Sequence, residues 1–151
     1  LYWDQAVYKK PGTRDEFPWH QDNGYTFIEP QAYLTCWVAL TDTDETNGCP
    51  CVLPGLHRHG TLHHDTTDLG HEIGLDSTDS LSIPLKAGSI AIFSSLTPHR
   101  TGPNLSDKVR KSYILQYAPE GARRLISHTL TEEVNDESRQ FLILKDGLAV
   151  D

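Results

Sequence analysis

Residues 81–94, LSIPLKAGSIAIFS, show the structural unit from which this fold is built. Apolar runs at 81–85 and 89–94 flank a Lys-Ala-Gly turn, a pattern typical of two short strands joined by a turn. Similar runs, separated by Gly, Pro and Asn, recur along the chain. The expected strands lie at about 4–10, 19–22, 33–40, 49–53, 81–85, 89–94 and 112–118. Many short strands with such turns predict an all-β sandwich or barrel with minor α-helix.

A histidine and a carboxylate share one of these runs, in Trp19-His20-Gln21-Asp22. On a strand the side chains of His20 and Asp22 point to one face, because successive side chains alternate. A third candidate ligand, His99, follows the apolar run 89–94. Two imidazoles and one carboxylate are the donors of a non-haem Fe(II) site that keeps positions open for O2 and other ligands. A lone His-x-Asp triplet also fits a solvated strand end.

Several stretches of the chain resemble the phytanoyl-CoA dioxygenase family of Fe(II)- and 2-oxoglutarate-dependent oxygenases. In the family's order they are QAVYKKPG at 5–12, PWHQD at 18–22, NGC at 47–49 with VLPGLHR at 52–58, and HRTGPN at 99–104. The resemblance implies a double-stranded β-helix, the jelly roll of cupin-like proteins. It also implies one oxygenase core domain, residues 1–151, without the longer N-terminal region usual in the family.

The resemblance implies that His20, Asp22 and His99 bind Fe(II) and form the catalytic centre. It further implies that Arg110 and Thr101 hold the distal carboxylate of the cosubstrate 2-oxoglutarate. An arginine suits a carboxylate because its planar fork binds bidentately and keeps its charge when buried. Without the metal ligands, Arg110 also fits a surface charge in the polar run 106–111.

Contacts to the cosubstrate and the substrate are expected from further positions. Gln5 and Trp37 fall where the family places additional contacts to 2-oxoglutarate, and Trp37 has the parity to face inward. Tyr25, three residues after Asp22, is the expected substrate contact nearest the metal. Arg58 and His59 are further candidates for contact with an anionic substrate.

The implied reaction consumes O2 and 2-oxoglutarate, hydroxylates an unactivated C–H bond of a small or lipid-like molecule, and releases succinate and CO2. The carboxylate of Asp22 argues against halogenation, because halogenating relatives lack it. Two alternatives stay open. One is a different oxidative outcome, such as desaturation or cyclisation, and the other is a non-catalytic jelly-roll module that binds a ligand or metal. Whether the substrate is a CoA ester also stays open.

A second group of histidines lies between residues 57 and 71, at His57, His59, His63, His64 and His71. A polar loop is the favoured interpretation over a second metal site, because no carboxylate or thiol accompanies these residues at ligand spacing. The segment 57–80 shows little strand pattern and is expected to act as a lid or a substrate-selecting loop. Residues 131–137 are acidic and are compatible with a helix.

The composition limits the partners of the chain. The net charge of −8 argues against nucleic acid and against a polybasic membrane surface, which leaves a small-molecule substrate as the expected partner. No apolar run approaches the ~20 residues that cross a bilayer. The three cysteines form no disulfide framework, so reduced thiols in a cytoplasmic protein are expected. The oligomeric state is left open.

Overall fold

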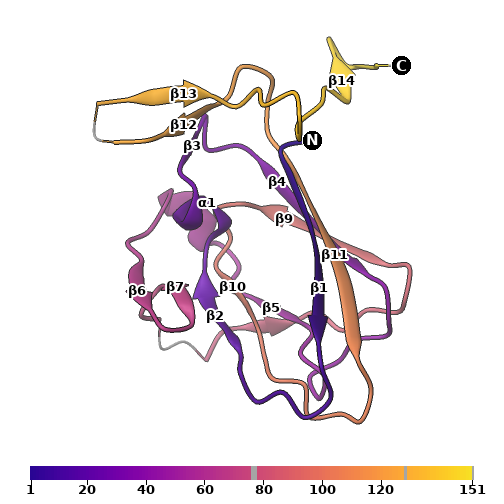
Figure 1. Ribbon diagram of the computed structural model, residues 1–151. Coiled ribbons are helices and arrows are strands. Elements are labelled where there is room, and N and C mark those ends of the chain that lie inside the picture. The colour runs from indigo at the N-terminus through magenta and orange to yellow at the C-terminus, as the bar shows by residue number, and fades with distance from the viewer. Residues whose placement is uncertain (76–77, 128, 151) are drawn as a thin grey trace.

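Two four-stranded antiparallel sheets form the body of the chain (Figure 1). The computed structural model describes residues 1–75, 78–127 and 129–150. In spatial order, the larger sheet consists of β1 (Trp3–Lys9), β11 (Arg110–Tyr117), β4 (Leu34–Ala39) and β9 (Ile90–Ser94). The smaller sheet consists of β2 (Phe17–His20), β10 (His99–Thr101), β5 (Pro50–Val52) and β8 (Leu81–Ser82). The all-β jelly roll predicted from the sequence is confirmed.

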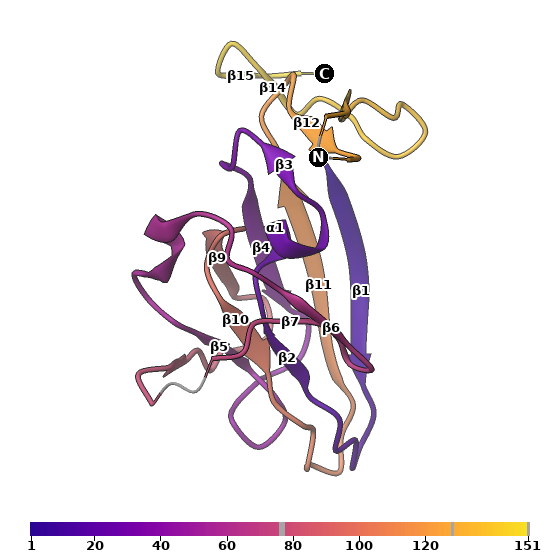
Figure 2. The ribbon, with the colours of Figure 1, turned by 90° about the vertical axis from the view of Figure 1, so that its left-hand side faces the viewer.

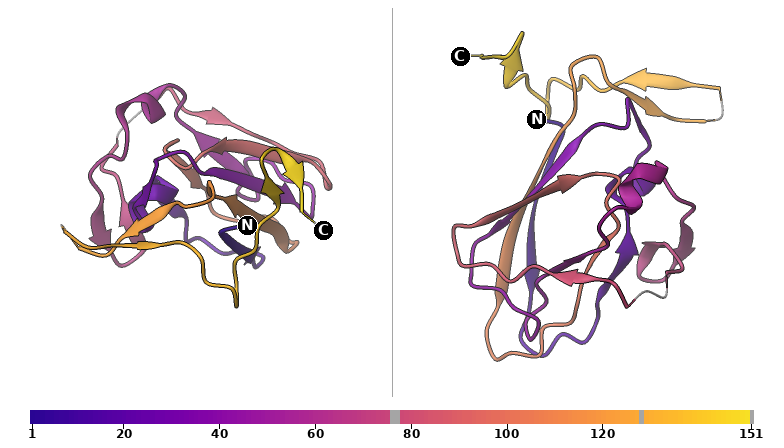
Figure 3. Two further views of the ribbon diagram at one scale, coloured as in Figure 1. Left: turned by 90° about the horizontal axis from the view of Figure 1, so that it is seen from above. Right: turned by 180° about the vertical axis from the view of Figure 1, so that it is seen from behind.

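Smaller elements surround the two sheets. A short helix, α1 (Asp22–Tyr25), follows β2, and a 3-10 turn, η1 (Leu56–His59), follows β5. The hairpin of β6 (Asp65–Thr67) and β7 (Gly70–Glu72) lies beside β2 and α1 (Figure 2). A third sheet at one end of the sandwich consists of β3 (Ile28–Glu29), β12 (Arg123–Leu125) and β13 (Thr131–Glu133). The chain ends in a hairpin of β14 (Leu144–Lys145) and β15 (Leu148–Ala149), near the N-terminus (Figure 3).

The core follows from the alternation of side chains along β4. Thr35, Trp37 and Ala39 are buried, whereas the residues between them are more exposed. This confirms the inward parity predicted for Trp37. Trp37 and Ala39 pack with Ala91 of β9 and Ile114 of β11. Truncating a buried tryptophan typically costs about 3–5 kcal/mol, so Trp37 contributes strongly to this core.

The strand predicted at 19–22 is wrong at its end, because β2 stops at His20 and Asp22 begins α1. The amide of Gly24 donates to the Gln21 carbonyl at 2.9 Å, which turns the chain into the helix. Gln21 itself keeps an extended backbone (φ −110°, ψ 141°). His20 and Asp22 therefore still lie on one side, although the reason is one extended residue and not a continuous strand.

Two further expectations need correction. The acidic segment 131–137 begins with strand β13 and not with a helix, because β13 pairs with β12 and Glu132 forms an ion pair with Arg124. The segment 57–80 contains the β6–β7 hairpin, although part of the segment lies outside the described residues. In residues 1–75, 78–127 and 129–150, no helix is long and apolar enough to span a membrane.

Candidate metal centre

Three potential metal ligands converge at the end of the smaller sheet. His20 at the end of β2 and His99 at the start of β10 are direct cross-strand partners, with ring centroids 4.1 Å apart. Oδ1 of Asp22 lies 3.8 Å from Nε2 of His20 and 3.7 Å from Nε2 of His99. The three ligand atoms all lie within 4.8 Å of one another, and among the described residues this is the one such group of His, Cys, Asp or Glu.

Each imidazole is oriented by a hydrogen bond from its Nδ1 to the backbone carbonyl two residues before it. Nδ1 of His20 lies 2.8 Å from the Pro18 carbonyl, and Nδ1 of His99 lies 3.0 Å from the Thr97 carbonyl. A carbonyl only accepts, so each Nδ1 carries a proton, and Nε2 is the atom that each ring can offer to a metal. Burial, and then the nearby His99, lower the pKa of His20 well below its usual value. His20 is therefore neutral at physiological pH, the form that binds metals.

Asp22 is oriented by the larger sheet. The hydroxyl of Thr35, buried on β4, donates a hydrogen bond to Oδ2 of Asp22. Oδ1 is thereby left facing the two imidazoles. Two imidazoles with converging Nε2 atoms and one carboxylate fit a borderline divalent cation such as Fe(II). Thr35 was not predicted as a site residue, although its inward parity on the strand could have indicated it.

Arg110 lies at the start of β11, and its side chain is 1% exposed. Its Nη1 donates to the Ser112 hydroxyl at 2.6 Å, and its guanidinium lies 5.2 Å from the centre of the Trp37 ring. In the described part of the chain, its buried Nε and Nη2 have no hydrogen-bond partner. Burial lowers the pKa of Arg110 to about 10, so it remains charged at neutral pH. A buried cation with two unpaired donors fits a carboxylate ligand.

Lys9 was not predicted from the sequence, although it lies beside this cation. It is the register partner of Arg110 on β1, and its Nζ donates to the Thr101 carbonyl at 3.0 Å. Burial, and then the charge of Arg110, lower the pKa of Lys9 to about 8. The side chain of Lys9 thus connects β1 with the end of β10, where Thr101 is half-buried. The burial that distinguishes Lys9 from most of β1 is known only from the structure.

A cavity of about 330 Å³ opens beside the metal ligands. His20 and Asp22 line it, and so do the predicted residues Gln5 and Tyr25. The other predicted residues are not among those that line it, namely His99, Thr101, Trp37 and Arg110, and the exposed Arg58 and His59 of η1. Tyr33 also lines it, and the lining residues that were not predicted from the sequence are Tyr2, Trp3, Phe17, Thr26, Gln116 and Arg124.

Comparison with known proteins decides the family. The sequence profile of the family "Phytanoyl-CoA dioxygenase (PhyH)" matches residues 1–112. The chain belongs to the phytanoyl-CoA dioxygenase family. It is 32% identical over 115 residues to a phytanoyl-CoA dioxygenase of Arabidopsis thaliana, which covers 72% of this chain and 41% of that protein. It is 33% identical over 118 residues to a methylphosphonate hydroxylase of Gimesia maris, covering 78% and 44%.

Solved structures of the family share the fold. EvdO2 from Micromonospora carbonacea var. aurantiaca, in complex with 2-oxoglutarate, superposes with a TM-score of 0.71 at 29% identity. That match covers 83% of this chain and 54% of EvdO2. The chain thus matches only about half of the length of the family members compared. Gln116 and Arg124 of the cavity lie beyond the residues that the family profile matches.

Proposed function

We propose that this chain is the core of an Fe(II)- and 2-oxoglutarate-dependent dioxygenase that hydroxylates an unactivated C–H bond. Its substrate is a small or lipid-like molecule, and its co-products are succinate and CO2. One observation carries the proposal. Converging metal ligands and a buried guanidinium with unpaired donors occur in one interior, where Thr35 contacts the ligand set and Trp37 contacts the guanidinium.

The contact of Thr35 with Asp22 and the contact of Trp37 with Arg110 are close enough for one cosubstrate to reach from the metal to the guanidinium. Thr35 and Trp37 are two residues apart on the inner face of β4, which corresponds to about 7 Å along a strand. A five-carbon dicarboxylate has a similar length. In this proposal His20, Asp22 and His99 hold Fe(II), and Arg110 binds the far carboxylate of 2-oxoglutarate. The bound iron, with 2-oxoglutarate and O2, supplies the oxidising power that breaks the C–H bond.

The chain's own residues orient and neutralise these groups. The Pro18 and Thr97 carbonyls keep the two imidazoles turned toward the metal, and Thr35 holds one oxygen of Asp22 away from it. Arg110 fixes the cosubstrate through a charged and directional contact. Trp37 forms the surface on which the guanidinium lies, Thr101 is assigned to the same carboxylate, and Gln5 contacts the cosubstrate from the cavity wall.

The substrate is expected to enter past aromatic side chains. Phe17 and Tyr25 stack with ring centroids 6.1 Å apart, and Tyr25 meets the edge of the His20 ring at 5.3 Å. An aromatic wall beside the metal favours an apolar C–H-bearing group over a charged one. The hydroxylase named among the relatives supports hydroxylation as the outcome. Arg58 and His59 remain predicted contacts for a distant, anionic part of the substrate.

Conversion of 2-oxoglutarate tests the proposal. The purified chain, supplied with Fe(II), O2 and pools of small metabolites, should form succinate, and His99→Ala should abolish this formation. Lys86→Ala is a suitable control because Lys86 is exposed and pairs only with Asp42 in the described structure. A folded, metal-loaded chain that never forms succinate with any pool would instead favour a non-catalytic binding module.

A further inference from the structure

The residue between the two early metal ligands has a role that the reaction does not explain. The side chain of Gln21 is fully buried, and its Nε2 donates to the Gly60 carbonyl at 2.9 Å and to the Leu96 carbonyl at 2.5 Å. Its Oε1 accepts from the amide of Leu62 at 2.7 Å. Leu96 lies three residues before His99. One amide side chain therefore joins the segment of His20 and Asp22 both to the segment of His99 and to residues 60–62.

His64 makes a second connection to the same segment. Its Nδ1 lies 2.9 Å from the Leu62 carbonyl and must donate to it, so Nε2 is the acceptor for the amide of Gln21 at 2.9 Å. The ring also occupies the space beside Gly24, where a Cβ atom would lie 2.1 Å from Cε1 of His64. Gly24 is therefore required for the packing of this imidazole against α1.

Two further hydrogen bonds extend the connection along α1. Nδ2 of Asn23 donates to the Thr61 hydroxyl at 2.7 Å, and the amide of His71 donates to the Tyr25 hydroxyl at 3.1 Å. We call residues 57–72 the histidine loop. Gln21, Asn23 and Tyr25 thus each bind the histidine loop, and the residues between them include the ligand Asp22.

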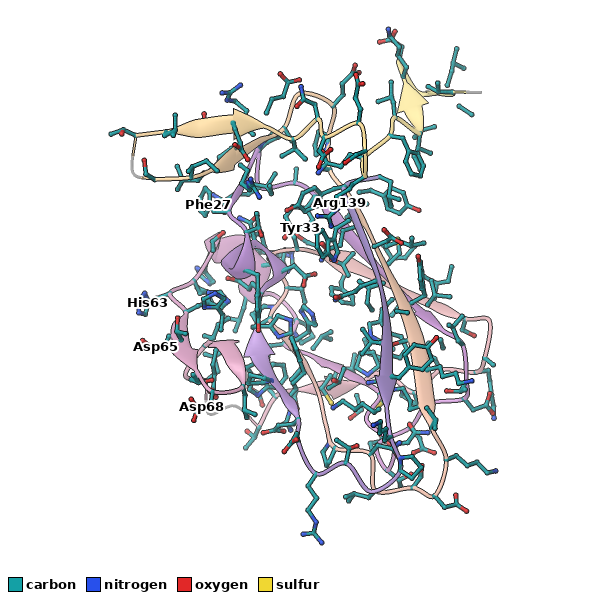
Figure 4. The ribbon with its side chains drawn as sticks, viewed as in Figure 1. Phe27, Tyr33, His63, Asp65, Asp68 and Arg139 are labelled. Atoms are coloured by element: carbon teal, nitrogen blue, oxygen red, sulfur yellow. The ribbon has the colours of Figure 1, made fainter. Side chains whose placement is uncertain are left out.

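The histidines of this loop do not behave alike. The side chain of His63 is 86% exposed and points outward beside Asp65 (Figure 4). His64, the next residue, is partly buried and hydrogen-bonded at both ring nitrogens. Burial lowers the pKa of His64, which favours the neutral ring that these two bonds require. The contrast separates a surface histidine from one that supports the structure.

We propose that Gln21 and His64 are positioning residues of the metal centre, and that the histidine loop is part of its scaffold. This inference rests on the proposed function. Gln21 and His64 touch none of the reacting groups. They set the distance between the His20–Asp22 pair and His99, so their loss changes how well the three ligands fit one cation. The histidine loop is bound at five of its residues, which favours a supporting role over the lid expected from the sequence.

Metal titration with a pair of linked variants tests the proposal. The probe is Co(II), titrated into the apo chain under argon and followed by its visible absorption, with circular dichroism confirming that each variant is folded. His64→Ala and Gly24→Ala should each weaken Co(II) binding about 10–100-fold, the usual effect of residues that orient metal ligands. The double variant should bind no more weakly than His64→Ala, because removing the ring also removes the clash at Gly24.

Two controls sharpen this test. His63→Ala, one residue away, should bind Co(II) as the wild type does. His64→Gln offers a side-chain oxygen to the Gln21 amide and should recover part of the affinity, which a general packing defect would not explain. Folded single variants with wild-type affinity, or fully additive losses in the double variant, would overturn the inference while leaving the proposed function intact. A wild-type chain that binds no Co(II) would overturn both.

Discussion

The interior of the sandwich holds two groups of polar side chains that differ in charge. We call the group of His20, Asp22 and His99 the metal end, and the surroundings of Arg110 the anion end. At the metal end, Nδ1 of His20, Nδ1 of His99 and Oδ2 of Asp22 are hydrogen-bonded to the protein. The remaining atoms, Nε2 of each imidazole and Oδ1 of Asp22, lie close together. At the other end, the buried Nε and Nη2 of Arg110 have no hydrogen-bond acceptor among residues 1–75, 78–127 and 129–150. The residue types at the first end suit a cation, and the buried guanidinium at the second end suits an anion. In the proposed function, the first end binds a cation and the second end binds an anion.

The largest expected effect comes from removing a metal ligand. His99→Ala should lower Fe(II) affinity by more than about 100-fold, beyond the usual cost of losing a residue that only orients a ligand. Anaerobic equilibrium dialysis measures this directly. Wild-type Fe(II) affinity in His99→Ala would mean that the metal binds elsewhere, and His99 would no longer be a ligand.

The next effect concerns the anion end alone. Arg110→Ala should weaken 2-oxoglutarate binding by about 2–5 kcal/mol, or at least about 30-fold, because the distal carboxylate loses its buried partner. Arg110→Lys should recover only part, since an ammonium lacks the planar fork. Calorimetry of the metal-loaded chain measures both. Fe(II) affinity should stay near that of the wild type, and a parallel loss of metal binding would show that the two ends are not separate.

A smaller effect is expected on the free energy of unfolding, where removing the charge of Arg110 should be favourable and not harmful. Arg110→Met should raise the free energy of unfolding of the ligand-free chain by about 1–3 kcal/mol, because it removes a desolvated charge with unpaired donors. Thermal denaturation measures this as a Tm higher by several degrees. Added 2-oxoglutarate should stabilise the metal-loaded wild type but not this variant. A less stable Arg110→Met would mean that the guanidinium is already satisfied within the protein.

The smallest effect depends on pH and on Lys9. Its pKa is lowered to about 8, so its charge, which assists Arg110 in attracting an anion, is lost as pH rises through 8. The affinity for 2-oxoglutarate should therefore fall between pH 7 and 9, by less than about tenfold for a partly solvated charge. Lys9→Met should be weaker at pH 7 and should lack this fall. A wild-type affinity that is flat across this range would remove Lys9 from the anion end.

The lowered pKa of Lys9 should also make the free energy of unfolding depend on pH. Between pH 8 and the unfolded value of 10.5, the unfolded chain binds a proton that folded Lys9 has released. The contribution of Lys9 to stability should therefore rise with pH in this window. Urea unfolding of the wild type and Lys9→Met at pH 7.5 and 9.5 compares the two slopes. Equal slopes would contradict the lowered pKa.

The main strands and the residue types of the candidate metal ligands were predictable because both depend on local pattern, although the strand expected at 81–85 is only β8 (Leu81–Ser82). The alternation along 33–40 places Trp37 inward, and His20, Asp22 and His99 stand out by residue type. The family motif supplied what spacing could not, namely that His99 lies opposite His20 although 79 positions separate them.

The supporting residues were not predictable, because their roles depend on contacts between distant segments. Nothing near Gln21 in the sequence shows that it binds Gly60 and Leu96. His64 cannot be told from His63 by residue type, since only the fold buries one and exposes the other. Lys9 could not be predicted for the same reason, whereas the alternation along β4 could have indicated Thr35. The strand prediction for Asp22 failed because the chain turns one residue earlier than its apolar pattern indicates.

One measurement tests the central claim, that both ligands bind in this one interior. Fe(II) and 2-oxoglutarate are added together to the chain without O2, and the visible spectrum is recorded. We expect a metal-to-ligand charge-transfer band that needs both additions, disappears in His99→Ala, and requires far more 2-oxoglutarate in Arg110→Ala. A folded wild-type chain that binds both but shows no such band would contradict it.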